Sequence, residues 1–262
     1  MDYVFIFIFG LFAGSFLNCA IYRLEVGQSP LKGRSYCPKC KKEIAWFDLL
    51  PVASFFLLKG KCRNCSSKIS WQYPLVELAA AATCLLTFYY SAGVGSLAGA
   101  VETAYALSIS LIFLLIFVYD LKHFIIPDGA VLLAAILSLA WLLFAFLGDI
   151  YILGEIAGYF LSGIGASAFF LFFFLISRGK WMGFGDIKLA LVIGLFLGFP
   201  GTITALFLAF LAGAIFGIIM IILGRKSIKS EVPFAPFLVA GSLAALFWGE
   251  ILLTHYFLFF KI

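Results

Sequence analysis

The chain has 262 residues, of which 64% are hydrophobic and 12% are charged, and its formal net charge is +5 at pH 7. Soluble domains carry about 25% charged residues and are only about half apolar. With a mean hydropathy of +1.13, the composition excludes a soluble fold and indicates an all-α polytopic integral membrane protein whose apolar surface is covered by lipid.

Eight apolar runs are expected to cross the membrane, because a helix needs about 20 residues to span a bilayer. They cover residues 3–21, 75–91, 103–120, 129–147, 151–177, 187–199, 201–224 and 237–260. Residues 187–224 are far longer than one crossing needs and contain Pro200-Gly201, which is a turn signal. We therefore count two crossings there. The first run lacks a basic flank and a small-residue cleavage site, so we expect a retained span.

Lysine and arginine are distributed unevenly between these runs. Segment 22–74 holds ten of the eighteen basic residues, and most others lie in every second loop, at 120–128, 178–188 and 225–236. Cytoplasmic loops of membrane proteins are enriched in basic residues. The pattern therefore predicts that these segments face the cytoplasm and that both termini lie outside.

Segment 22–74 contains four of the six cysteines, in two Cys-x-x-Cys units formed by Cys37 with Cys40 and by Cys62 with Cys65. Two such knuckles can complete a tetrahedral four-thiolate zinc site. A module this small buries too little to fold alone, so the metal would contribute folding energy. Disulfides are the alternative, which a reducing cytoplasm disfavours. Nucleic acid is not an expected partner, because topology already explains the positive charge.

Two aspartates are candidates for hydrolytic chemistry. The chain has two histidines and contains neither an HExxH nor a GxSxG motif, which disfavours a zinc protease and a serine hydrolase. Asp120 ends a long apolar run shortly before Ile126-Pro127-Asp128, which breaks the helix. Asp186 follows Gly183-Phe184-Gly185 at the start of a later run.

The predicted topology places Asp120 and Asp186 at the same cytoplasmic depth. Two carboxylates brought close together share one proton, so one can accept a proton from water while the other donates to the scissile carbonyl. Alternatively, each aspartate caps a helix. Capping suits Asp186 and Asp128 at helix N-termini, but it suits Asp120 poorly at a helix C-terminus. The residues alone leave both alternatives open.

Motifs along almost the whole chain, in order, resemble those of the type IV prepilin peptidases, also called type IV leader peptidases. Each motif alone is weak, but their order makes the resemblance highly specific. It is carried by Gly14-Ser15-Phe16-Leu17-Asn18 with Tyr22-Arg23, Gly33-Arg34-Ser35 with the four cysteines, Ile69-Ser70-Trp71-Gln72-Tyr73-Pro74 with Glu77, Asp120 with Ile126-Pro127-Asp128, Gly183-Phe184-Gly185-Asp186-Ile187-Lys188-Leu189, and Pro233-Phe234-Ala235-Pro236-Phe237.

The resemblance implies a GxGD-type aspartyl protease of the bacterial inner membrane with Asp120 and Asp186 as its catalytic pair. Its substrates would be precursors of type IV pilins, pseudopilins or competence pilins, cut after the glycine that ends a short basic leader. Members with the four cysteines often also N-methylate the new N-terminus with S-adenosylmethionine, for which the sequence identifies no binding site. The residues implied to support the active site or bind substrate are Asn18, Arg23, Glu77, Pro127, Asp128, Gly183, Gly185, Lys188, Pro233 and Pro236.

The predicted organisation has three parts: a first transmembrane helix at 1–21, a cytoplasmic zinc-binding module at 22–74 that is associated with the methyltransferase activity, and a membrane-embedded peptidase domain at 75–262. A presenilin-like intramembrane protease would also suit Tyr119-Asp120 and the motif at 183–186, but the opening motif and the cysteines argue against it. A transporter would suit intramembrane acidic residues, although the two halves show no hydropathy symmetry.

Overall fold

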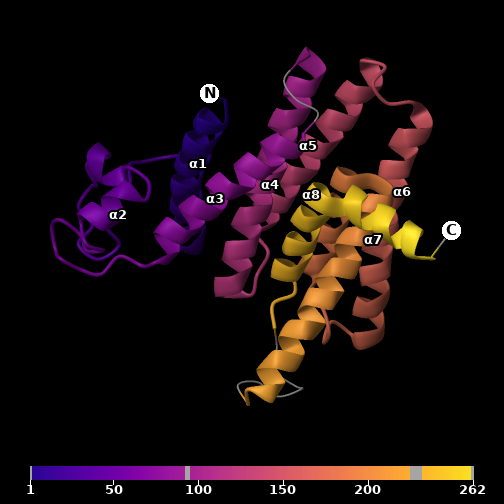
Figure 1. Ribbon diagram of the computed structural model, residues 1–262. Coiled ribbons are helices and arrows are strands. Elements are labelled where there is room, and N and C mark those ends of the chain that lie inside the picture. Colours follow the sequence, from indigo (N-terminus) through magenta and orange to yellow (C-terminus); the bar gives the residue numbers. More distant parts are fainter. Residues whose placement is uncertain (1, 92–94, 225–231, 261–262) are drawn as a thin grey trace. The chain divides into compact units, whose positions relative to one another are not determined.

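The computed structural model describes residues 2–91, 95–224 and 232–260. The secondary structure of these residues is helical, apart from two isolated β-bridges that pair Tyr36 with Glu43 and Lys61 with Lys68. The chain divides into two compact units, Met1–Gly93 and Val94–Ile262. In Figure 1 the first unit is drawn in indigo and purple, and the second runs from magenta through orange to yellow.

The first unit is built on two long helices, α1 (Asp2–Glu25) and α3 (Gln72–Tyr90), with the short helices η1 (Trp46–Leu49) and α2 (Ala53–Leu57) between them in the chain. α1 and α3 approach closely at two glycines. A Cβ on Gly10 would lie 2.5 Å from Cα of Ala81, and one on Gly14 would lie 2.6 Å from Cα of Glu77. Small residues four apart are typical of helix packing in membranes. Both helices were predicted from the sequence, but this contact, which pairs α3 with α1, was not.

The second unit contains five long helices. They are α4 (Leu97–His123), α5 (Asp128–Leu147), α6 (Leu153–Ser177), α7 (Phe184–Ile222) and α8 (Ala235–Phe260). Fully buried side chains such as Phe113, Phe170 and Leu189 form its core. Large apolar side chains also remain exposed on the outer faces of these helices, as expected where lipid covers the surface.

α7 reverses its direction at Gly198 and Phe199, whose backbone is not helical. Before this break, Gly194 packs closely against the backbone of Gly163 of α6, and Gly198 packs against the ring of Tyr159, so that a Cβ at either glycine would clash. After the break, the ring of Phe210 stacks on that of Phe170 of α6. The two halves of α7 therefore run along α6 in opposite directions. Sequence analysis predicted this reversal at Pro200-Gly201, two residues later than the observed break.

Among the described residues, five helices are long and apolar enough to cross a membrane: α1, α4, α5, α6 and α7, with a shorter apolar helix at Ala235–Gly249. The eight predicted crossings comprise these five helices together with α3 and α8, with the two halves of α7 counted separately. The largest difference in bounds is at α4, which begins six residues before the predicted residue 103 because Ser96 Oγ caps it by accepting from the Gly99 amide at 3.1 Å. Most of the predicted basic loop 225–236 lies outside the described residues.

The glycine contact in the first unit makes a testable prediction. Gly10→Ala would force a methyl group against the backbone of Ala81, and overpacking of this kind typically costs about 1–3 kcal/mol. We expect a lower unfolding temperature in detergent, measured by size exclusion after heating. Gly158→Ala in α6, where the added Cβ meets nothing within 4 Å, serves as the control and should not lower it. Equal unfolding temperatures for both variants would contradict the close contact.

Candidate functional site

The four cysteines of the first unit converge on one point. The sulfur atoms of Cys37, Cys40, Cys62 and Cys65 all lie within 4.8 Å of one another, and Sγ of Cys37 and Sγ of Cys65 are 3.9 Å apart. All four are free thiols. Metal–sulfur bonds of about 2.3 Å in a tetrahedron place the sulfurs about 3.8 Å apart. The donor set therefore fits a metal ion, as the sequence predicted.

The two knuckles repeat the same backbone geometry. The Lys41 amide donates to the Cys37 carbonyl at 2.9 Å, and the Ser66 amide donates to the Cys62 carbonyl at 2.9 Å. Lys41 and Ser66 both have left-handed backbones, with φ of 58° and 55°. A β-bridge closes each turn. This internal repeat was not predicted, although aligning the two Cys-x-x-Cys units would have placed Lys41 opposite Ser66 and Ile44 opposite Ile69.

The crowded sulfurs ionise unequally. Burial opposes ionisation of Cys37, but the backbone amides of Cys40 and Lys39 and neighbouring thiols donate to its sulfur and lower its pKa to about 6. At Cys40 a backbone hydrogen bond from Lys42 favours the thiolate, yet burial and the sulfurs of Cys37 and Cys65 together raise its pKa to about 11. Hydrogen bonds with the side chain and backbone of Ser67 also lower the pKa of Cys65, so without a cation the neighbouring sulfurs oppose ionisation most clearly at Cys40. A bound metal ion would remove that repulsion.

Arg23, near the end of α1, organises the loop before the first knuckle. Its side chain is buried and its guanidinium donates to five backbone carbonyls, those of Ser29, Pro30, Lys32, Gly33 and Arg34, at 2.7–3.4 Å. These contacts assign Arg23 a loop-holding role that the sequence did not reveal. The planar fork of arginine suits this task because it presents several donors in a fixed geometry.

Asn18 and Glu77 make similar contacts between helix and loop. Nδ2 of Asn18 donates to the Tyr73 carbonyl at 3.0 Å, at the start of α3. Oε2 of Glu77 accepts from the Val52 amide at 2.7 Å. Both side chains are buried. The residues implied to support the site from this unit are therefore all engaged in holding the chain between α1 and α3.

Asp120 and Asp186 come together in the second unit. Asp120 lies in the last turn of α4 and Asp186 in the first turn of α7, and both are buried. Oδ2 of Asp186 accepts from the Gly183 amide at 3.0 Å and so caps α7. The Asp120 carboxylate has no hydrogen-bond partner in the part of the chain that the structure describes. Capping thus accounts for one contact of Asp186 and for none of Asp120.

The two aspartate motifs also touch through their neighbours. A Cβ on Gly185 would lie 3.0 Å from Cδ1 of Ile126, so the glycine allows the first turn of α7 to approach the loop after α4. Pro127 precedes the first residue of α5, Asp128, which forms an ion pair with Lys188. These contacts fix the starts of α5 and α7 beside each other.

Pro233 and Pro236 lie at the start of α8 and are half-buried and buried, respectively. The adjacent Phe234 ring packs against Phe170 of α6 and Phe210 of α7. Among the described contacts, none joins either proline to the aspartates. Their implied role in the active site therefore stays a prediction.

Comparison with known proteins matches both units. Residues 8–91 match the bacterial peptidase A24 N-terminal domain, and residues 105–218 match the type IV leader peptidase family. A prepilin leader peptidase/N-methyltransferase from Bacillus subtilis (strain 168) is 32% identical over 253 residues, covering 96% of each chain. Proteins of the same name from Aeromonas salmonicida (strain A449) and Legionella pneumophila are 32% and 31% identical, covering 96% and 97% of this chain and 92% and 94% of theirs. No solved structure matches this chain.

The role of Arg23 can be tested by Arg23→Lys. Lysine keeps the charge but cannot reach five carbonyls, and hydrogen bonds from charged groups contribute about 1.5–3 kcal/mol each. We expect a loss of about 2 kcal/mol or more in module stability, seen as faster limited proteolysis after residue 25. Arg34→Lys is the control, because Arg34 is exposed in its pair with Glu43. Equal proteolysis of both variants would contradict this role.

Proposed function

This chain belongs to the type IV leader peptidase family, and we propose that it removes leaders from type IV prepilins with Asp120 and Asp186 as its catalytic pair. The observation that carries the proposal is a pair of buried carboxylates at helix ends whose motifs touch through Gly185 and Ile126, and of which Asp120 has no hydrogen-bonding role within the described residues. Buried acidic groups at membrane depth are costly and are characteristic of functional sites. The relatives, all prepilin leader peptidase/N-methyltransferases, support the same activity.

In the proposed mechanism the pair holds one proton between its carboxylates. Negative charge is better tolerated on Asp186, at the N-terminus of α7, than on Asp120, at the C-terminus of α4. Asp186 therefore takes a proton from the attacking water, while Asp120 donates its proton to the scissile carbonyl oxygen. The resulting tetrahedral intermediate collapses when Asp186 passes its proton to the leaving nitrogen and Asp120 takes a proton back from a hydroxyl of the intermediate, which restores the starting pair. The Gly183 amide holds the Asp186 carboxylate in place.

Neighbouring residues are proposed to position this pair. Gly185 allows the start of α7 to approach Ile126, Gly183 donates its amide to Asp186, and Pro127 directly precedes α5. The ion pair of Asp128 with Lys188 holds the two helix starts together. Movement of either helix start would change the separation of the carboxylates, on which proton sharing depends.

The chain is a multi-pass protein of the inner membrane, and its topology is a proposal. We infer eight crossings, with α3, α8 and both halves of α7 each counted, and both termini outside. Support comes from the reversal within α7 and from the basic residues of segment 22–74. This topology directs Asp120, Asp186 and the cysteine module to the cytoplasm. Pilin, pseudopilin or competence-pilin precursors would be cut there, where the basic leader meets the apolar helix.

The cysteine cluster is proposed to hold zinc through Cys37, Cys40, Cys62 and Cys65, because four thiolates at this spacing are typical of structural zinc. Zinc would contribute folding energy to the module. The names of the relatives also support N-methylation of the new N-terminus, for which S-adenosylmethionine would supply the methyl group. We assign no residue to that donor. Presenilin-like cleavage inside a span and ion transport gain no support from these relatives.

The aspartate pair predicts the result of a cleavage assay. Asp120→Asn and Asp186→Asn keep the shape but remove the acid, and acid–base catalysis contributes about 10²–10⁴-fold. We expect each variant to lose at least about 10²-fold in the rate of leader removal from a purified prepilin, read by product mass. A further methyl mass that depends on S-adenosylmethionine would reveal the second activity.

Asp149→Asn is the matched control for that assay, because Asp149 is exposed in the turn after α5. Its rate should equal that of the unaltered protein. Wild-type rates in either Asp120→Asn or Asp186→Asn would overturn the assignment of the pair.

The metal site predicts one zinc ion per chain by elemental analysis of the purified protein. Cys62→Ser should release the zinc and expose the module to proteolysis, since the metal contributes folding energy. Cys19→Ser is the control, because Cys19 lies in α1 and outside the cluster, and it should retain the ion. Zinc retained by Cys62→Ser would refute four-thiolate ligation.

A further inference from the structure

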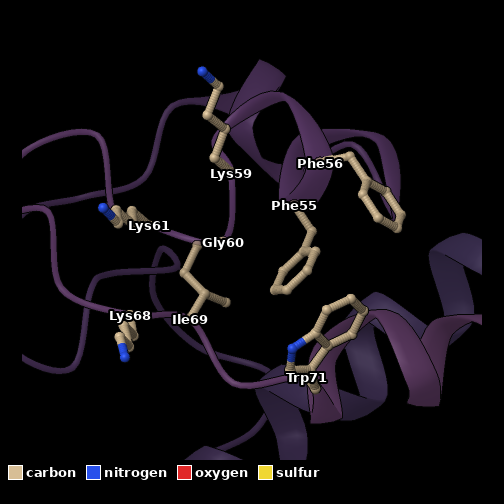
Figure 2. Close-up of a pocket in the computed structure, with 8 residues that line it drawn as sticks. All are labelled: Phe55, Phe56, Lys59, Gly60, Lys61, Lys68, Ile69 and Trp71. Atoms are coloured by element: carbon tan, nitrogen blue, oxygen red, sulfur yellow. The ribbon is translucent and has the colours of Figure 1, made fainter.

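A cavity of about 500 Å³ lies in the first unit between α2, the second knuckle and the start of α3. It is lined by Phe55, Phe56, Lys59, Gly60, Lys61, Lys68, Ile69 and Trp71. Figure 2 shows the rings of Phe55, Phe56 and Trp71 on one side, while the lysines lie on the other side with their ammonium groups pointing away from one another. The rings of Phe55 and Trp71 are 4.8 Å apart. The wall is thus divided into an apolar end and a cationic end.

Large apolar side chains are also exposed around the aromatic end of this cavity. Phe56, Leu57 and Trp71 are 60%, 77% and 61% exposed, and Leu50 is 38% exposed. We call these four residues the apolar tip. They belong to a segment otherwise rich in charge, where exposed apolar groups of this size are typical of a binding surface.

The contacts of Glu77 fix how deep this segment lies along α1 and α3. Val52, directly before α2, donates its amide to Glu77 at 2.7 Å, and Cα of Glu77 lies against Gly14 of α1. Gly14 is seven residues before Ile21, where the apolar run of α1 ends. At 1.5 Å per residue, this is about 10 Å inside the end of that run, whereas Glu77 lies two residues, or about 3 Å, inside the start of the apolar run at 75–91.

The backbone conformation of Val52 is consistent with a segment that is held against α3 by its hydrogen bond to Glu77. Val52 has a φ of 59°, which is strained for a β-branched residue and persists only where surrounding contacts hold it. Interfacial helices bury their apolar faces about 5–10 Å into the headgroup and acyl boundary. The depth set by Glu77 therefore puts the start of α2 within that boundary.

The charge of the surrounding module decides which occupant fits. Segment 22–74 contains ten basic and three acidic residues, a net charge of +7. Lysines near a membrane surface attract anionic lipids. The same charge would repel a basic leader peptide. An anionic amphiphile, with its acyl chain at the rings and its headgroup at the lysines, matches both ends of the cavity.

We propose that the apolar tip inserts into the interface of the bilayer that the chain spans, and that Lys59, Lys61 and Lys68 bind the headgroups of its anionic phospholipids. The proposal depends on α1 crossing the membrane and not on the catalytic assignment. It predicts lipid contact at α2, outside the long apolar helices. It also predicts selection for anionic headgroups by one of the two knuckles.

Photo-crosslinking of the full-length protein in nanodiscs tests the insertion. A benzophenone amino acid placed at Leu57 should form adducts with phospholipid, detected by mass. The same group at Leu31 is the control, because Leu31 is 81% exposed but belongs to the loop beyond the end of α1. We expect at least a tenfold excess of lipid adduct at position 57. Equal or absent adducts at position 57 would overturn the insertion.

Native mass spectrometry tests the headgroup selection. The protein, equilibrated with equal amounts of phosphatidylglycerol and phosphatidylcholine, should retain the anionic lipid preferentially. The triple variant Lys59→Gln, Lys61→Gln and Lys68→Gln should lose at least tenfold of this preference. The control variant Lys32→Gln, Lys39→Gln and Lys42→Gln removes the same charge from exposed positions around the first knuckle, and it should keep the preference.

Equal losses in both triple variants would show a general charge effect and would refute the assigned site, as would an unchanged preference in the first variant. The zinc content of each variant verifies that the module remains folded. None of these readouts involves leader cleavage. Failure of this inference is therefore distinguishable from failure of the proposed peptidase activity.

Discussion

Lipid offers no hydrogen-bond partners, so polar groups on these helices have to find partners within the protein. Asn18 and Glu77 meet this constraint through hydrogen bonds with the backbone of Tyr73 and Val52, and Arg23, just beyond the first apolar run, binds the loop that follows α1. The same constraint singles out Asp120, whose buried carboxylate has no hydrogen-bond partner among the described residues. A buried carboxylate of this kind is costly, and the approach of the Asp186 motif, through Gly185, to Ile126 after α4 offers a functional reason for the cost.

Each unit thus uses buried polar groups for a different purpose. In the first unit they hold the metal-binding knuckles and the apolar tip against α1 and α3. In the second unit, the contact of Gly185 with Ile126 and the ion pair of Lys188 with Asp128 hold helix starts around two acids. The proposed reaction needs such a rigid arrangement, because proton sharing depends on the separation of the carboxylates.

The sequence predicted the features that depend on composition and spacing. Apolar runs predicted the long helices, and the Cys-x-x-Cys spacing predicted the metal-binding cluster. Asp120 stood out because a negative charge at the C-terminus of a helix is unfavourable, so that helix capping does not explain it. Contacts between distant backbones were not predictable in this way. The packing of Gly10 on Ala81, the five carbonyls around Arg23 and the bond from Val52 to Glu77 depend on which segments meet in space. The spacing of these residues in the sequence does not indicate which partners they contact.

A double-mutant cycle can show whether Asp120 and Asp186 act as one unit in the reaction. Rates of leader removal would be measured for Asp120→Asn, Asp186→Asn and the double variant on one prepilin. Residues that act as a unit are strongly non-additive, so the account predicts that the double variant is no slower than the slower single variant. A double variant whose loss equals the product of the two single losses would show independent roles and contradict the pair.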